Sequence, residues 1–412
     1  MVNFKNNKII LNFSSTDNGG AGGAAYQFHY NLKNSKLNSF LFVARKTKKD
    51  KKLFQLRNNF TYKLQAKTTQ LKNYFNLTNK NYFFLNSGIQ FVINYEKIKK
   101  IIGNKKKIHC IVIHSVPNFL DFNNILELKY KFNCKVYFRL YDMQNFTAGC
   151  SYSLGCQKYK QNCLDCPGIN STILKNKTYK NFLQKKKIIK LINPEILSSS
   201  HFEMNRSKKS SLFKNFIHHH IPIGVEPKLF YPTQLIKKNK DKTIFLFGSS
   251  DLETYRKGLK YFLEALKKCK FKNKLKIILI GSEKNYFKNL NIETQNLKYV
   301  KNFKLLNQIF NHSHFCIIPS IDETGPSMLN MSMMASTPCI VFNIGDAFKY
   351  VKNNISGFKC RNKDIKNLSK NIDLAINMSE NKFYSMKKRC RKVALKFFTD
   401  KIQISKIKKI IR

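Results

Sequence analysis

The residues best suited to chemistry stand together in the second half of the chain, between Pro319 and Ser327. An apolar run ends there, and Glu323, Gly325 and Pro326 lead into a methionine-rich helical pattern. Proline suits the first turn of a helix, and the free N–H groups of that turn attract an anion such as a phosphate. We therefore expect a phosphate-binding turn at Gly325, Pro326 and Ser327, with the Glu323 carboxylate beside the ligand.

A second group of candidates follows the apolar run Ile244–Phe247. Gly248 ends this run, and Arg256 and Lys257 come a few residues later. A glycine gives the backbone room, and the two cations could offset the charge on a departing phosphate. Because lysine is abundant in this chain and arginine is scarce, Arg256 carries more weight than Lys257.

The first half of the chain offers weaker candidates. A glycine-rich turn, residues 14–25, includes Gly20 and Gly22, which would let the backbone approach a ligand closely, although a tight structural turn explains them equally well. His114 and Asp142 each follow an apolar run, where a parallel sheet places its functional loops. For a histidine in this position, a structural role is the more common outcome.

Four cysteines are close together, with the spacing C-x5-C-x6-C-x2-C. They are Cys150, Cys156, Cys163 and Cys166. Four thiolates at such spacing suit a structural zinc ion, while a pair of disulfides or reduced thiols packed under a loop are the alternatives. A thiolate-only site is closed, so we expect no catalytic metal there and no cofactor required for catalysis.

Short apolar runs alternate with longer helical patterns along almost the whole chain. The runs cover residues 9–13, 40–43, 108–113, 136–140, 244–247, 277–280, 316–318 and 339–342. Runs of this length, joined by helices, are typical of buried parallel strands in a doubly wound α/β sheet. The sequence therefore predicts an α/β protein.

The alternation of apolar runs and helical patterns begins again after residues 218–225, and this predicts a domain boundary. We expect one Rossmann-like domain over residues 1–224, with a cysteine-rich insert at 150–167, and a second over residues 225–395, facing each other across a central cleft. His218–His220 read as a strand and linker. A basic helix should follow at 396–412, where Ile404, Ile407 and Ile411 stand three and four residues apart. It could pack on the protein or lie on a membrane, and packing is the more common case.

The charge of the chain implies anionic partners. Its 412 residues include 76 Lys and Arg against 23 Asp and Glu, a net charge of +53, and the hydrophobic share of 42% excludes wholesale disorder. No apolar stretch approaches the ~20 residues of a membrane-spanning helix, and no signal peptide is evident. We expect a cytoplasmic protein that could be peripheral at the inner face of the cytoplasmic membrane, where residues 62–81 could dock. Lysine enrichment through genomic drift is the alternative.

The order of these features resembles GT-B glycosyltransferases of the family 4 type. The similarity lies in Glu323 with the turn and helix that follow it, in the Lys257-Gly258 pair, and in the hinge Pro222-Ile223-Gly224. That family usually carries a second Glu eight residues after the first, and here this position is Met331. The residue that usually holds the ribose of the nucleotide is therefore missing.

The segment from Leu140 to Cys150 narrows the resemblance. It is similar to His-Asp-Met-Trp-x-Phe-Thr-Gly-x-Cys, found in polysaccharide-assembly transferases of the colanic-acid type, except that the family's His is Tyr141. The similarity continues in matching order through Cys156, Lys158, Tyr159, Cys163, Cys166 and Pro167.

The resemblance implies a bacterial glycosyltransferase of the hexosyltransferase type in cell-surface polysaccharide biosynthesis. It would transfer a sugar, with retention, from a nucleotide-diphosphate donor to a glycan or lipid-linked acceptor. The implied catalytic residues are Glu323, Asp142 and His114. The implied donor-binding residues are Gly20, Gly22, Gly248, Arg256, Lys257, Gly325, Pro326 and Ser327.

Three other functions deserve comparison. Met331 and Tyr141 suggest a catalytically weakened relative, because each replaces a group expected to contact the donor. A nucleic-acid-binding protein fits the charge, but the aromatic residues follow strand and helix periodicity rather than an RNA-binding pattern. A dinucleotide oxidoreductase lacks its glycine fingerprint.

Overall fold

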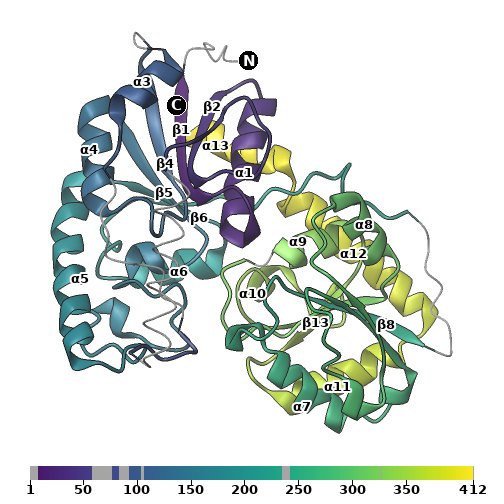
Figure 1. Ribbon diagram of the computed structural model, residues 1–412. Helices are drawn as coiled ribbons and strands as arrows, with labels where there is room; N and C mark the ends of the chain where they lie inside the picture. Colours follow the sequence, from purple (N-terminus) through teal and green to yellow (C-terminus); the bar gives the residue numbers. More distant parts are fainter. Residues whose placement is uncertain are drawn as a thin grey trace. The chain divides into compact units, whose positions relative to one another are not determined.

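The computed structural model describes residues 8–57, 77–82, 92–103, 106–233, 242–325 and 327–411. The chain forms two compact units (Figure 1). Unit 1 comprises Met1–Ser199, Glu203–Ile221 and Ile404–Arg412, and unit 2 comprises Ser200–Phe202 and Pro222–Gln403. The chain thus passes into unit 2 at Pro222 and returns to unit 1 for its last residues.

Unit 1 is built on a seven-stranded parallel sheet with the order β3-β2-β1-β4-β5-β6-β7. The strands are β1 (Ile9–Thr16), β2 (Asn38–Arg45), β3 (Leu53–Gln55), β4 (Ile108–Ile113), β5 (Lys135–Leu140), β6 (Glu195–Ser198) and β7 (His218–His220). The predicted strands at 9–13, 40–43, 108–113 and 136–140 are confirmed, and His218–His220 do form a strand. The winding direction reverses between β1 and β4, which pair in parallel.

Helices cover both faces of this sheet. They are α1 (Gly19–Asn34), α3 (Tyr95–Ile102), α4 (Phe122–Phe132), α5 (Thr172–Ile192) and α6 (His201–Lys209), with short 3-10 turns η1 (Gln144–Phe146) and η2 (Lys158–Lys160). Figure 1 shows α3, α4 and α5 on one side of the sheet. Their buried side chains, such as Ile98, Ile125 and Phe182, pack with alternate strand residues in one apolar core. Burial on both faces explains why the strands read as continuous apolar runs.

The opposite face of the sheet is covered by α1 and by the end of the chain, α13 (Asp400–Ile410). Ile404, Ile407 and Ile411 are buried there, packed with Ile10 and Phe28. The apolar stripe of the carboxyl-terminal helix is therefore used for packing within unit 1, and its lysines face outward or bind nearby backbone, as Lys406 does with the His220 carbonyl.

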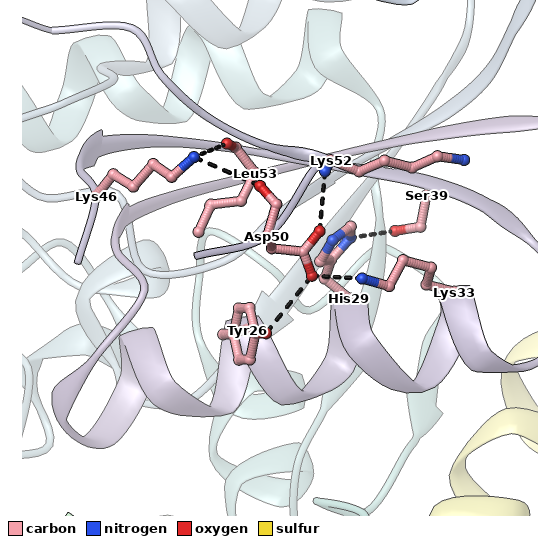
Figure 2. A network of polar contacts seen from close by, with 8 residues as sticks. All are labelled: Tyr26, His29, Lys33, Ser39, Lys46, Asp50, Lys52 and Leu53. Atoms are coloured by element: carbon pink, nitrogen blue, oxygen red, sulfur yellow. Dashed lines mark hydrogen bonds and ion pairs between the residues drawn. The ribbon is translucent and has the colours of Figure 1, made fainter. Parts of the chain in front are cut away.

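A polar network secures the turn between β2 and β3 to helix α1 (Figure 2). The Asp50 carboxylate accepts hydrogen bonds from Lys33 Nζ at 2.5 Å and from the Lys52 backbone N–H at 2.9 Å. Burial opposes ionisation of Asp50, but the bonds from Lys33 and Lys52 outweigh it and lower the pKa of the carboxyl. His29, from the same helix, meets the Ser39 hydroxyl at 2.8 Å, and burial lowers its pKa to about 4.

Unit 2 repeats the architecture with a six-stranded parallel sheet, in the order β10-β9-β8-β11-β12-β13. The strands are β8 (Thr243–Gly248), β9 (Leu275–Ile280), β10 (Glu293–Leu297), β11 (Phe315–Ile318), β12 (Cys339–Phe342) and β13 (Gly357–Cys360). The helices are α7 (Leu259–Lys268), α8 (Phe303–Asn311), α9 (Ser327–Met334), α10 (Ala347–Tyr350), α11 (Ile365–Ile376) and α12 (Glu380–Phe397), with 3-10 turns η3 (Tyr255–Lys257), η4 (Lys272–Lys274) and η5 (Lys288–Leu290). The four strands predicted in this half are confirmed.

Both units are therefore doubly wound α/β folds, as the sequence predicts. In unit 2, α8, α9 and α12 share one apolar core on one face, and α7 lies beside α11 (Figure 1). The winding reverses between β8 and β11. Ligands of such sheets bind outside the carboxyl ends of the strands at this reversal. Among the described residues, no helix combines the length and the apolar character that a membrane crossing requires.

The packing of α13 predicts a large stability cost for removing one buried side chain. Replacing Ile407 by Ala should lower the free energy of unfolding by about 2–5 kcal/mol, because a fully buried isoleucine leaves a cavity. The exposed Ser405→Ala on the same helix is the control and should change stability by less than about 0.5 kcal/mol. Urea denaturation of both variants measures the difference, and equal stabilities would contradict this packing.

Candidate functional site

Three charged side chains meet at the point where the unit 2 sheet reverses its winding. Glu323 lies in the loop after β11, and Arg256 and Lys257 form η3 in the loop after β8. Arg256 Nη1 is 2.5 Å from Glu323 Oε1, and Lys257 Nζ donates to the same oxygen. The structure thus brings together the predicted carboxylate and both predicted cations, although they are more than sixty residues apart in the sequence.

Backbone contacts hold these two loops against each other. The Ile321 N–H donates to the Arg256 carbonyl at 2.8 Å. Gly258, next to η3, has a left-handed φ of +78°, and a Cβ atom there would lie 1.7 Å from the Pro319 carbonyl oxygen. The approach of the two loops therefore requires glycine at position 258, a role that the pair Lys257-Gly258 did not reveal in the sequence.

The electrostatics of this triad suit an anionic ligand. Burial opposes the charge on Glu323, yet Arg256 and Lys257 outweigh it and lower the pKa of the carboxyl to about 2. Burial also lowers the pKa of Lys257, against the opposing effect of Glu323. Two cations and one carboxylate leave the triad itself with one net positive charge. Such a group can bind a diphosphate and stabilise charge that develops on it.

A third loop, which follows β12, packs against the Glu323 loop. A Cβ atom on Gly325 would meet the Asp346 carboxylate at 2.7 Å, and Gly345, at φ +55°, lies against the Thr324 carbonyl. Asp346 is 1% exposed. Sequence reasoning missed it, because a single Asp in an ordinary loop gives no motif. Close packing against Asp346 therefore accounts for the glycine at position 325.

The remaining unit 2 candidates lie on the same edge. Gly248 is the last residue of β8, and a Cβ atom there would come within 3.1 Å of Ile280. Ser327 opens α9, while Pro326 lies outside the described residues. Met331, at the position where the resemblance expects a second Glu, is partly buried and packs against the apolar core.

In unit 1, the His114 ring is enclosed in the core. Its Nδ1 meets the Tyr141 hydroxyl at 3.2 Å, and its Nε2 meets Asn12 Oδ1 at 3.0 Å. Its exposed fraction is 0%, and burial together with Arg139 and His29 lowers its pKa well below the usual value. A neutral ring with both nitrogens engaged is suited to a structural role, so the structure favours that alternative over catalysis.

Asp142 and the glycine-rich turn also have structural partners. Asp142 follows β5, is 9% exposed, and accepts from the Gln144 N–H at 2.9 Å, which opens η1. A Cβ atom on Gly22 would lie 2.3 Å from Thr16 Oγ1, so helix α1 needs glycine there to meet β1. Gly20 is exposed with no atom near its Cβ position, which leaves it open to contact a ligand.

Two cavities lie away from this triad, both in unit 1. One, of about 830 Å³, lies at the amino ends of β4, β5 and β6, the edge opposite to the one where such sheets bind ligands. The charged triad of unit 2 is therefore the better candidate for the functional site. The other, of about 20 Å³, is lined by all four clustered cysteines, Cys150, Cys156, Cys163 and Cys166.

The close approach at Gly258 predicts that no side chain is tolerated there. Gly258→Ala should lower the stability of unit 2 by at least about 2 kcal/mol. Gly258→Asn separates the two causes, because asparagine tolerates a left-handed φ but still carries a Cβ. We expect Asn to be as harmful as Ala, and Lys260→Ala on the exposed side of α7 to be neutral. Thermal melts decide, and rescue by Asn would contradict the contact.

Comparisons with known proteins agree with this geometry. The family model described as "Glycosyl transferases group 1" matches residues 233–396, the part that carries the triad. No curated protein matches the chain in sequence. Among solved structures, sucrose-phosphate synthase from Thermosynechococcus elongatus is similar at 14% identity, with 98% of each chain covered and a TM-score of 0.67.

Two further structures share the fold. Anabaena HepE, solved with UDP and glucose, is 12% identical, with 98% of this chain and 99% of that chain covered and a TM-score of 0.63. WaaG, a glycosyltransferase involved in lipopolysaccharide biosynthesis, is 10% identical, with the same coverage and a TM-score of 0.63. At these identities the likeness establishes the fold. The chain therefore has the GT-B fold of these structures, and residues 233–396 of its second unit match the glycosyl transferases group 1 model.

Proposed function

We propose that the protein is a glycosyltransferase that moves a sugar from a nucleotide-diphosphate donor to a glycan or lipid-linked acceptor. The observation that carries the proposal is the triad of Glu323, Arg256 and Lys257, placed at the winding reversal of the glycosyl transferases group 1 domain. That position and its net positive charge are what a donor diphosphate requires.

Each side chain of the triad has a distinct role in this proposal. Arg256 and Lys257 bind the diphosphate oxygens through their N–H groups, of which a guanidinium has five and an ammonium has three. As the bond to the sugar breaks, negative charge moves onto the diphosphate, and both cations stabilise it. Glu323 keeps the cations in place and contacts the donor sugar. The chemistry proceeds with retention and without a covalent enzyme intermediate.

The acceptor belongs to cell-surface polysaccharide biosynthesis in this proposal, and the transferred sugar is a hexose. Support comes from the resemblance of residues 140–167 to polysaccharide-assembly transferases, and from the shared fold of WaaG. The acceptor binds to unit 1, in which Asp142, which follows β5 at the carboxyl edge of the sheet, is a candidate for contact.

A second function, a relative that binds the donor but turns it over slowly, is favoured by one observation. Met331 occupies the position of the second Glu and packs against the apolar core. A ribose hydroxyl that would bond to a carboxylate then loses its partner, which costs about 1–3 kcal/mol if the hydroxyl is buried. Saturation-transfer NMR with UDP-glucose and other nucleotide sugars measures binding separately from turnover. Tight donor binding without transfer would favour this second function.

The triad predicts strong effects of single substitutions on transfer. Glu323→Gln and Arg256→Ala should each lower kcat/KM by about 10²–10³-fold, because their contacts act on charge in the transition state. Glu264→Gln is the control, since Glu264 is an exposed partner of Lys267 on α7. Circular dichroism confirms that each variant is folded. Unchanged turnover in both triad variants would remove the basis of the proposal.

We also propose that the protein is cytoplasmic and works at an anionic membrane surface, where a lipid-linked acceptor would lie. The charge of +53 supports this, because each Lys or Arg near an anionic leaflet contributes about 1 kcal/mol. Most of residues 62–81, the expected docking segment, lies outside the described residues. Nucleic acid is not a partner in this proposal.

The membrane proposal predicts binding that depends on lipid charge and on salt. The protein should sediment with vesicles that contain phosphatidylserine, and raising the salt concentration should release it steeply. Vesicles of neutral phosphatidylcholine are the control and should bind little. Equal binding to both would exclude an electrostatic surface, and stronger binding to RNA at matched salt would favour the nucleic-acid alternative.

A further inference from the structure

The segment that joins η1 to α5 is ordered without a regular framework of its own. Between Phe146 and Thr172 its one helical element is the short turn η2, and several of its residues adopt left-handed φ angles, among them Leu154, Cys163 and Asp165. Yet Tyr159, Cys163 and Cys166 in this segment are all buried. A long irregular segment loses much conformational entropy on ordering, so some additional interaction must fix it.

The four cysteines of this segment surround one small space. Cys150, Cys156, Cys163 and Cys166 all line the same cavity of about 20 Å³. A sphere the size of a water molecule needs roughly 10–15 Å³ of such a cavity, so this space suits a single small ion rather than an organic ligand. The four side chains come from different turns of the segment, and their common lining of this cavity is what brings them together.

Hydrogen bonds from neighbouring residues hold three of the four cysteine side chains. The backbone of Ala148 hydrogen-bonds to Cys163, the backbone of Gly168 hydrogen-bonds to Cys166, and the Thr147 side chain hydrogen-bonds to Cys150. Hydrogen bonds of this kind orient thiolate ligands and tune the metal that they hold.

Lysines supply compensating positive charge around the segment. Lys158 and Lys175 both bind Asp165, which lies between two of the cysteines, and Lys158 also lines the cavity. Lys185 Nζ, from α5, donates to the Gln144 carbonyl at 2.7 Å and the Thr147 carbonyl at 3.0 Å, close to Cys150. Four thiolates around a divalent ion carry two net negative charges, and the lysines around the segment offset part of this charge, since Asp165 already takes up part of the charge of Lys158 and Lys175.

We propose that Cys150, Cys156, Cys163 and Cys166 bind one zinc ion in a closed tetrathiolate site that orders residues 147–171. Soft thiolate ligands select zinc among the common divalent ions, and a site with four protein ligands is structural rather than catalytic. In the described part of the chain, no three His, Cys, Asp or Glu side chains stand ready to hold a metal ion. The ion must therefore draw the sulfur atoms inward, which rotation about each Cα–Cβ bond allows.

Metal analysis of the full-length protein tests the site directly. Mass spectrometry of the elements should find about one zinc per chain in protein purified under reducing conditions. Cys163→Ser should lose that zinc. Cys134→Ser is the matched control, because Cys134 is a free thiol of unit 1 outside the cluster, and it should retain the metal.

A second measurement keeps the test decisive if Cys163→Ser does not fold. Titrating the wild-type protein with a mercurial thiol reagent should release zinc to a colorimetric indicator, and cobalt substituted for zinc should show the visible bands of a tetrahedral thiolate site. Removing zinc should expose residues 147–171 to proteolysis. Metal-free protein with the same protease resistance, an iron-loaded site, or disulfides within the cluster would each overturn the proposal. None of these measurements uses sugar transfer, so their outcome is independent of the proposed function.

Discussion

The carboxylate of Glu323, shared between Arg256 and Lys257, is the interaction on which the candidate site depends. The side chain of Glu323 is 7% exposed, so its charge has lost most of its contact with water. A buried charge without partners costs several kcal/mol, and pairing with Arg256 and Lys257 offsets this cost. The same pairing holds both cations at the carboxyl edge of the sheet. Stability and binding chemistry therefore use the same atoms.

This ion triad needs a particular backbone to form. The loops after β8 and β11 are neighbours only because the sheet reverses its winding between these strands. The glycine at 258 then lets η3 reach the Pro319 carbonyl, and the third loop closes against Gly325 through Asp346. Each contact has little tolerance for an added methyl group. Packing of main chain against main chain thus holds the loops together, and these loops carry the charged side chains of the site.

The strands that position the site could be predicted from the sequence, whereas several edge strands could not. Central parallel strands such as β4 and β11 are buried on both faces and read as short apolar runs. The edge strand β10 reads Glu-Thr-Gln-Asn-Leu and is mostly half-exposed, so it leaves no apolar signal. Strand β3, with three residues, is too short to show any periodicity.

At the site, the charged residues could be identified from the sequence. The hydrogen-bond partners of the buried polar residues could not. Arg256 and Glu323 stood out because arginine is scarce and a buried strand ends just before the glutamate. His114 also stood out because it follows a buried strand. Yet one of its ring nitrogens is hydrogen-bonded to Asn12, which is 102 residues away in the sequence. No local pattern carries that information, because a long-range hydrogen bond depends on which strands become neighbours.

Met331 stands where the resemblance expects a second glutamate, and this difference affects which ligands the candidate site can recognise. Met331 packs against the apolar core, whereas Arg256 and Lys257 bind Glu323. The attraction for a diphosphate that we propose depends on Arg256 and Lys257, so it does not require a carboxylate at position 331. Recognition of a hydroxyl by a buried acceptor can discriminate between ligands by several orders of magnitude, and the thioether of methionine is only a weak acceptor. In the function that we propose, discrimination between nucleotides must then come from contacts other than one at position 331.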